Sequence, residues 1–311
     1  MNSQKRILVL CGGKFAFKAL QLLAAEKFLC GIGIGKGSSI ISEVLEGESE
    51  KNNLAFKSFP DKKSLSEMKP WIENLNPDFI FSISFPFLIS EDILSYGKEK
   101  FINFHPGPLP QYRGPMPIFE VLKNQEKNTA ISVHFMDSKY DEGPIIFKET
   151  LKINEDDTYG KLAVKLSNHT AQVALNMANM AEYAKEIPSS IQESTDAYYY
   201  EKPALTDTCI KWKNMTASEI IALVNSCNPW NTGADTSFEG EQIKIITTSL
   251  FDQSHENAMP GTILVINENG TINVACSDNK QVSIEILKTD IGIITAKQFN
   301  YQGNILGKKF K

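Results

Sequence analysis

Three residues whose side chains suit acyl transfer lie in the middle of the chain. Asn103 and His105 end an apolar run that begins at Phe101, and they are two residues apart. On an extended strand both side chains therefore project from one face. A Pro-Gly-Pro sequence follows, which puts His105 at a strand-to-loop corner. Because an amide can donate to a developing oxyanion and an imidazole can move a proton, the pair predicts acyl-transfer chemistry.

Asp141 supplies the third group, a carboxylate. It follows the β-rich run 130–136 and lies in a loop closed by Gly143 and Pro144. A carboxylate beside His105 would raise the pKa of the imidazole and fix its tautomer. Taken one at a time, these three could also be turn residues with local hydrogen bonds and a structural histidine. Their spacing together favours a catalytic group.

These segments resemble the folate-dependent formyltransferases, a family that includes the methionyl-tRNA formyltransferases. Asn-x-His, a Leu-Pro-x-aromatic-Arg-Gly turn and Met-Asp-x-x-x-Asp-x-Gly occur in that order at 103–105, 109–114 and 136–143. Segments that look like the family's carboxy-terminal domain lie at 197–202, 210–212, 228–230 and 260–264. The resemblance therefore covers essentially the whole chain.

The resemblance implies an enzyme that moves a formyl group from 10-formyltetrahydrofolate, its co-substrate, to a primary amine. Asn103, His105 and Asp141 would be catalytic, with the role of His105 as acid, base or electrostatic donor left open. The pterin would lie against the segment that follows the strand at 78–84. The implied cofactor-binding residues are Phe85, Phe87, Leu88, Ile89, Asp137 and Gly143.

Two neighbouring features have more than one interpretation. Phe81 and Ile83 belong to the strand itself, and core packing explains them better than cofactor contact. Arg113 is either a substrate-binding residue or a loop cation bonded to neighbouring carbonyls.

The acceptor is expected to be a small amine, such as the amino group of a nucleotide-linked aminosugar, with methionyl-tRNA as the alternative. The family's tRNA enzymes carry a basic loop after the second strand, whereas the segment Glu43 to Glu50 is acidic. Residues 205–311 contain nine Lys, no Arg and eleven Asp or Glu, a net charge of −2. Binding to an RNA backbone is favoured by positive surface. A further alternative, a catalytically idle relative that binds nucleic acid, is disfavoured by the intact catalytic set.

The elements that position these residues alternate between strands and helices in the first half of the chain. Strands are predicted at 6–11, 30–34 and 78–84, and helices at 15–24 and 62–74. This alternation predicts an α/β fold with a doubly wound, mostly parallel sheet. Gly12 and Gly13 lack the spacing of a dinucleotide-binding loop and are expected only to make a turn.

The second half changes character. A long helix is predicted over 157–185 and a shorter one over 217–226, the latter begun by a capping box of Thr216 and Glu219. Closely spaced β-rich runs follow, which indicates a small barrel. The resemblance implies an oligonucleotide-binding-like (OB-like) barrel. We predict a catalytic domain over 1–190, a linker over 191–205 and a barrel domain over 206–311, with residues 308–311 a solvated basic tail.

Composition fits a globular protein of ordinary polarity. The 311 residues carry a formal charge of −5, and 42% are apolar. No apolar run approaches the roughly 20 residues that span a bilayer, so a cytoplasmic protein without membrane contact is expected. The five cysteines show neither CxxC pairs nor zinc-ligand spacing, so they are expected to be reduced and mostly buried, and no metal is implied. The oligomeric state is not predicted.

Overall fold

The computed structural model describes residues 4–37, 39–97, 100–184, 186–193, 195–300 and 303–311. The chain forms two compact units. The first contains residues 1–117, 128–152 and 163–200, and the second contains 118–127, 153–162 and 201–311. Lys185, the last residue of the predicted long helix, lies outside the described residues. The domain and linker boundaries expected from the sequence stay predictions.

The first unit is built on a seven-stranded sheet in the order β3-β2-β1-β4-β5-β6-β7. Its strands are β1 Ile7–Cys11, β2 Leu29–Ile34, β3 Ala55–Ser58, β4 Phe79–Ile83, β5 Phe101–His105, β6 Asn128–Phe135 and β7 Ile145–Lys152. The pairs from β3 to β5 are parallel, and β5-β6 and β6-β7 are antiparallel. The predicted mostly parallel sheet is therefore confirmed.

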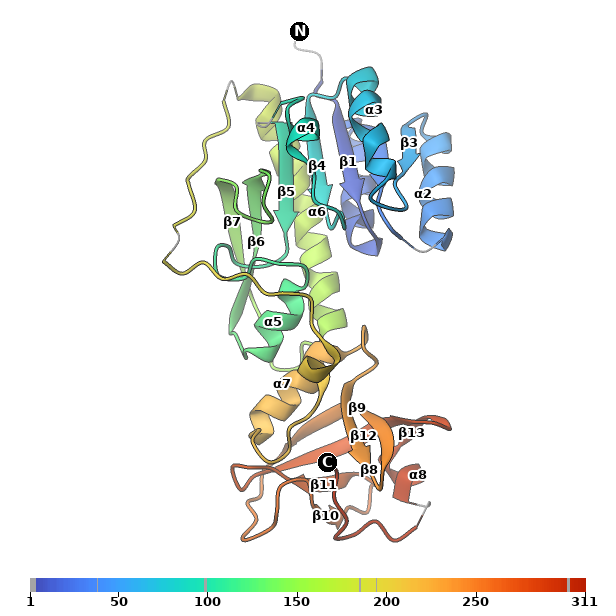
Figure 1. Cartoon of the computed structure of the whole chain (residues 1–311), viewed down its shortest axis with the longest axis vertical. Coiled ribbons are helices and arrows are strands. Elements are labelled where there is room, and N and C mark those ends of the chain that lie inside the picture. The colour runs from blue at the N-terminus through green and yellow to red at the C-terminus, as the bar shows by residue number, and fades with distance from the viewer. Residues whose placement is uncertain (1–3, 38, 98–99, 185, 194, 301–302) are drawn as a thin grey trace. The chain divides into compact units, whose positions relative to one another are not determined.

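Helices cover both faces of this sheet. They are α1 Phe17–Ala25, α2 Ser39–Lys51, α3 Met68–Leu75, α4 Glu91–Leu94 and α6 Tyr159–Tyr183, whereas α5 Pro117–Lys123 belongs almost wholly to the second unit. Figure 1 shows α3 and α4 in front of the strands and α6 behind them. Because helices cover both faces of the sheet, all five residues of β1 are buried, and the sequence of this strand is an unbroken apolar run.

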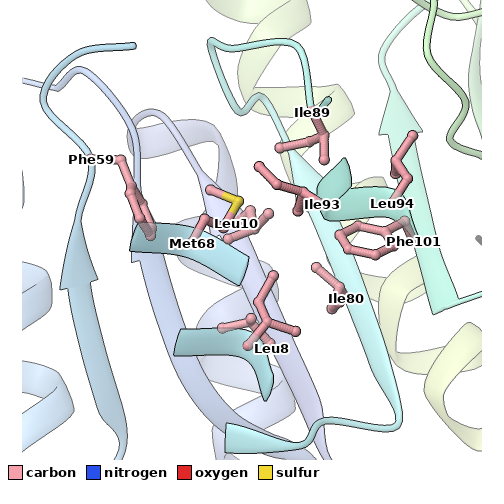
Figure 2. Close-up of a cluster of buried hydrophobic side chains, with 10 residues drawn as sticks. Leu8, Leu10, Phe59, Met68, Ile80, Ile89, Ile93, Leu94 and Phe101 are labelled. Carbon is pink, nitrogen blue, oxygen red and sulfur yellow. The ribbon is translucent and has the colours of Figure 1, made fainter. Parts of the chain in front are cut away.

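The core on the α3 and α4 side is a cluster of side chains from both helices and from the strands beneath them (Figure 2). Met68 of α3 and Ile93 of α4 pack over Leu8 of β1 and Ile80 of β4. Ile89 belongs to this cluster and is fully buried. The cluster therefore fixes the position of the segment between β4 and α4.

We expect Ile89→Ala to lower the free energy of unfolding by about 2–5 kcal/mol, because a buried aliphatic side chain leaves a cavity when truncated. Urea denaturation measures the change. Ile40→Ala is the matched control, since Ile40 on α2 is 71% exposed and its truncation should stay within about 0.5 kcal/mol of the parent. Equal effects of the two substitutions would contradict the packing described for Ile89.

The second unit is built on a six-stranded antiparallel sheet. Its strands are β8 Ala234–Phe238, β9 Glu241–Phe251, β10 Ile263–Ile266, β11 Ile272–Ala275, β12 Gln281–Thr289 and β13 Gly292–Thr295. They run in the order β10-β11-β12-β9-β8, and β13 pairs with β12. Helix α7, Ala217–Cys227, begins at the predicted capping box, because Thr216 accepts from the Glu219 N–H and Glu219 accepts from Thr216. The short helix α8 spans Ala296–Asn300.

The strand ladders of this sheet do not close into a barrel over the part of the chain that the structure describes. Lys309 and Phe310 make isolated bridges to Thr262, next to β10, and to Phe238 at the end of β8. Phe310 is 2% exposed and stacks on Trp212 with ring centroids 5.6 Å apart. The expectation of a solvated tail at 308–311 is therefore wrong, because an aromatic side chain anchors it in the core.

Burial of the cysteines follows the expectation in part. Cys11, Cys227 and Cys276 are buried, Cys30 is half-buried and Cys209 is exposed. Burial raises the pKa of the Cys11 thiol to about 12. Within the described ranges, no helix combines the length and apolar character needed to cross a bilayer.

Candidate active site

Two predicted catalytic residues project from one face of β5, as the two-residue spacing requires. The neighbouring strand β6 runs antiparallel, and the register sets Asn103 opposite His134 and His105 opposite Ser132. Opposed residues share a face, so His134 joins the same group. The Asn103 Nδ2 atom lies 3.0 Å from His134 Nε2. The His134 Nδ1–H donates to the Phe135 carbonyl at 2.7 Å, which leaves Nε2 to accept from the Asn103 amide.

Asp141, from the loop between β6 and β7, completes the group. One carboxyl oxygen, Oδ1, lies 3.4 Å from His105 Nδ1, 3.6 Å from His134 Nε2 and 3.4 Å from Asn103 Nδ2. The other oxygen, Oδ2, accepts from the Gly114 backbone N–H at 2.9 Å. The side chains of His105, His134 and Asp141 are 4%, 2% and 11% exposed. The structure therefore brings all three predicted catalytic residues into contact and adds His134.

The charges of this group support one another. Burial by itself would lower the pKa of His105, but the negative charge of Asp141 and the hydrogen bonds of the ring to Asp141 and to the Tyr112 carbonyl outweigh it, so the pKa is raised. Burial would raise the pKa of Asp141, but the positive charge and hydrogen bond of the neighbouring His105 hold it well below the usual range. Asp141 therefore stays ionised to lower pH than a free carboxyl group, and His105 keeps its proton to higher pH than it would without Asp141.

The hydrogen bonds of His105 indicate which ring nitrogen is available for chemistry. Nε2–H donates to the Tyr112 backbone carbonyl at 2.7 Å, so that edge of the ring is occupied. Nδ1 faces Asp141 at the longer distance of 3.4 Å. A group that reacts beside Asp141 therefore meets the Nδ1 edge.

A pocket opens at this group, beside the segment that follows β4. Most of the residues predicted to bind the cofactor lie in its wall together with Asn103 and Asp141. Its lining is Ser82, Phe85, Phe87, Leu88, Asn103, His134, Met136, Asp137, Lys139, Tyr140 and Asp141. Phe85 and Phe87 form an edge-to-face pair with ring centroids 5.7 Å apart. The lining thus combines aromatic and aliphatic side chains with polar ones, while the buried His105 is not among the lining residues and contacts Asp141, which is.

The segment that carries these aromatic residues passes very close to two glycines. A Cβ atom at Gly12 would collide with the Ser84 carbonyl, and one at Gly35 would collide with the Pro86 ring. Close packing against residues 84–86 therefore requires glycine at positions 12 and 35, whereas a Cβ atom at Gly13 would meet nothing within 4 Å.

Two residues predicted to bind the cofactor lie elsewhere. Ile89 is in the core cluster, and Gly143 does not line the pocket. Gly143 packs against the Phe135 carbonyl, where any side chain would collide. Phe81 and Ile83 are fully buried, in agreement with the expectation that they are core residues.

Arg113 is not among the pocket-lining residues. Its guanidinium donates through Nε and Nη2 to Gln192 Oε1, at 3.2 and 2.8 Å, and Nη1 lies 3.6 Å from a carboxyl oxygen of Glu142. Its contacts are therefore with a side-chain amide and a carboxylate, and neither of the two interpretations from the sequence included Gln192.

His134 and Tyr140, which line the pocket, and Gln192, which contacts Arg113, were not predicted from the sequence. For His134 a signal existed, since it alternates with Ser132 and Met136 along the β-rich run, but only the pairing with β5 sets it opposite Asn103. Tyr140 precedes the predicted Asp141 directly. Gln192 lies in a polar segment with no periodicity, so no pattern in the sequence singles it out.

Comparison with known proteins agrees with this arrangement. Residues 5–177 match the family of formyl transferases, and residues 204–302 match the formyl transferase C-terminal domain. The methionyl-tRNA formyltransferase of Acetivibrio thermocellus is 29% identical over 290 residues, which cover 90% of this chain and 91% of the relative. That of Caldanaerobacter subterraneus is 32% identical over 277 residues, covering 88% and 79%.

A solved structure of similar fold is that of WlaRD, a sugar 3N-formyl transferase. Its TM-score is 0.69 at 16% sequence identity, and the match covers 91% of this chain and 97% of that one. Identity this low indicates the fold alone. The family model matches more than half of the chain, and one relative is more than 30% identical over most of its length. The chain therefore belongs to the formyl transferase family.

Proposed function

We propose that this protein transfers the formyl group of 10-formyltetrahydrofolate to a primary amine. The observation that carries the proposal is the position of Asp141 Oδ1, which faces Asn103, His105 and His134 at the wall of a pocket that Phe85 and Phe87 also line. Flat aromatic and aliphatic walls suit a pterin, and Asp137 offers a carboxylate to its N–H groups. WlaRD, which shares the fold, was crystallised in the presence of dTDP and 5-N-formyl-THF.

In the proposed reaction the amine attacks the formyl carbon, and negative charge develops on the formyl oxygen. The Asn103 amide and the His105 imidazolium donate hydrogen bonds to that oxygen. Asn103 Nδ2 is 3.4 Å from Asp141, a long contact that a bound oxygen can displace. As the bond between carbon and N10 breaks, His105 gives its proton to N10, and the neutral ring then accepts the proton released by the amine. The ionised Asp141 stabilises the imidazolium throughout.

For the acceptor we propose a small amine, such as the amino group of a nucleotide-linked aminosugar. The four glutamates of the acidic segment, Glu43, Glu46, Glu48 and Glu50, are all exposed on α2. Helix α2 follows the carboxyl end of β2, and the carboxyl ends of parallel strands share one edge of the sheet with the catalytic group. Since α2 leads back to the start of the parallel strand β3, Glu43 lies nearest that edge and Glu50 farthest from it. Negative charge along this helix opposes an RNA backbone.

Formylation of methionyl-tRNA is the second candidate. It is favoured by the two relatives described above, both of them methionyl-tRNA formyltransferases that are similar to this chain over 88–90% of its length. An OB-like barrel in the second unit, which we propose from the isolated bridges at Lys309 and Phe310, would be compatible with either acceptor.

Binding of a formyl-folate is the first test of this proposal. Titration calorimetry with a stable formyl-folate analogue should give saturable heat, and Phe87→Ala should weaken binding roughly tenfold or more, because about 1.5–3 kcal/mol accompanies burial of such a side chain. Ile89→Val is the control, since Ile89 lies in the core and outside the pocket wall. No heat at high ligand concentration, or equal affinity of the Phe87→Ala protein, would contradict the pocket assignment.

Turnover distinguishes the acceptors. The formyl donor is supplied with a panel of aminosugar nucleotides and, separately, with initiator methionyl-tRNA, and release of tetrahydrofolate is measured. Release with an aminosugar nucleotide supports the proposal, and release with methionyl-tRNA alone supports the second candidate. Folate binding without turnover on any amine would favour the idle relative.

A further inference from the structure

The turn that carries Asp141 is held by a side chain from a distant part of the chain. Gln192 lies in the segment that follows α6, and its Nε2 amide donates to two backbone carbonyls, those of Asp141 and Gly143, at 2.8 Å each. The two carbonyls belong to the same turn, on either side of Glu142. One amide group therefore ties the turn at two points.

Arg113 fixes the orientation of that amide. Its guanidinium donates to Gln192 Oε1 through two nitrogens, at 2.8 and 3.2 Å. A guanidinium only donates and a carbonyl only accepts, so the amide oxygen must face Arg113 and the amide nitrogen must face the turn. The Arg113 side chain is 13% exposed, so this fork is largely shielded from water.

Residues 113–114 also hold the side-chain carboxylate of Asp141. Gly114, the residue after Arg113, donates its backbone N–H to Asp141 Oδ2. Gly114 has φ +118°, and a side chain there would collide with the Tyr200 carbonyl. Backbone hydrogen bonds between Arg113 and residues 198 and 200 keep this stretch in place, at 3.1 and 2.9 Å. The backbone and the carboxylate of Asp141 are thus both tied to residues 113–114.

Such restraint is needed because Asp141 adopts a backbone conformation that L-residues rarely keep. Its φ is +57°, in the left-handed region. A residue stays there only when its surroundings determine the conformation. The restraint comes from the hydrogen bonds of Gln192 to the Asp141 and Gly143 carbonyls and from the hydrogen bond of the Gly114 N–H to the Asp141 carboxylate.

We propose that Gln192, oriented by Arg113, is a positioning residue that sets the distance between the Asp141 carboxylate and His105 Nδ1. The proposal rests on the proposed function of the catalytic group. Gln192 itself touches no reacting atom. If it loses its amide nitrogen, the turn can relax out of the left-handed conformation, and the carboxylate then leaves the ring it stabilises.

The decisive variant is Gln192→Glu, which keeps the shape of the side chain and replaces the donor by a carboxylate oxygen that repels both carbonyls. We expect turnover to fall about 10²-fold, since misplacing a catalytic group by about 1 Å can cost that much, with the KM for the formyl donor changed less than about threefold. The control is Gln172→Glu, the same chemical change on α6, where Gln172 is exposed and donates to Asn176. This control should leave both constants unchanged.

A second readout follows His105 directly and needs no substrate. The ring signals of His105, identified by their loss in His105→Gln, are titrated by NMR in the parent and in each variant. The titratable groups near the ring are Asp141 and, beyond it, His134, so both histidines are followed. We expect Gln192→Glu to lower the pKa of His105 by about one unit or more, because an adjacent opposite charge typically contributes about 1–3 units.

The two readouts separate the proposal from the proposed function. If the parent transfers no formyl group but Gln192→Glu still lowers the pKa of His105, the function is wrong and the positioning role stands. If Gln192→Glu folds and leaves both turnover and the pKa of His105 unchanged, the positioning role is wrong. Should that variant fail to fold, Gln192→Met, which removes the donor without adding charge, decides the question on the same two measurements.

Discussion

We expect His105→Ala, Asp141→Asn and the double variant to lose similar amounts of turnover, each about 10²–10⁴-fold. His105 moves the proton and Asp141 holds its imidazolium, so removal of either one disables the same unit, and the second substitution adds little. Asn103→Ala should fall by about 10²–10³-fold, the usual cost of one oxyanion donor. The measurement is steady-state release of tetrahydrofolate, with folding checked by circular dichroism.

A histidine and carboxylate pair outside the site provides the control. His169 on α6 lies 3.0 Å from Glu149 on β7, and the two side chains are 44% and 35% exposed. His169→Ala and Glu149→Gln should therefore retain parent turnover. If either His105→Ala or Asp141→Asn also behaved like the parent, that residue would have no place in the mechanism. If the double variant lost the product of the two single effects, the residues would act independently.

Local patterns were enough to predict part of the catalytic group. The two-residue spacing of Asn103 and His105 fixes their common face, because side chains alternate along any strand. The approach of Asp141 depends on more, namely a left-handed backbone and the Gly114 N–H 27 residues away. Its position after a β-rich run made Asp141 a candidate, which taken alone would also fit a turn residue, and the resemblance to a family supported the catalytic role.

Contacts between distant segments explain what the sequence did not reveal. His134 becomes a neighbour of Asn103 only through the antiparallel pairing of β5 with β6. Gln192 reaches the Asp141 turn across 51 positions, from a segment without periodicity. Residues 308–311 were predicted to be a solvated tail, but Phe310 is buried because its ring stacks on Trp212.

Neighbouring residues in one segment also differ in ways that a pattern cannot resolve. Phe87, Leu88 and Ile89 look alike as cofactor candidates, yet Ile89 belongs to the core cluster with α3 and α4 (Figure 2). Phe87 and Leu88 instead line the pocket. The acidic charge of residues 43–50 was predicted from the sequence, but the helix α2 that carries it was not. That helix matters because it displays the acidic segment.

The acceptor can be decided by the salt dependence of the reaction. If methionyl-tRNA is the substrate, neutralising about 6–10 phosphates would make the apparent affinity fall roughly 10³–10⁵-fold between about 50 and 200 mM salt. An aminosugar nucleotide carries few charges, so its KM should change far less over the same range. We expect the shallow dependence for the substrate that supports efficient turnover, and weak tRNA binding that is lost at physiological salt.

Neutralising the acidic segment also tests whether the acceptor is methionyl-tRNA or a small amine. The quadruple variant Glu43→Gln, Glu46→Gln, Glu48→Gln and Glu50→Gln removes four exposed negative charges from α2. Because these side chains repel a phosphate backbone, the variant should bind tRNA more tightly at low salt while turnover on a small amine stays nearly unchanged. The proposal of a small-amine acceptor would be overturned if the parent formylated methionyl-tRNA efficiently at physiological salt, with a steep salt dependence that the variant left unaltered. The contacts to the nucleic acid would then have to come from surfaces other than α2, and the exposed glutamates would have no part in selecting the acceptor.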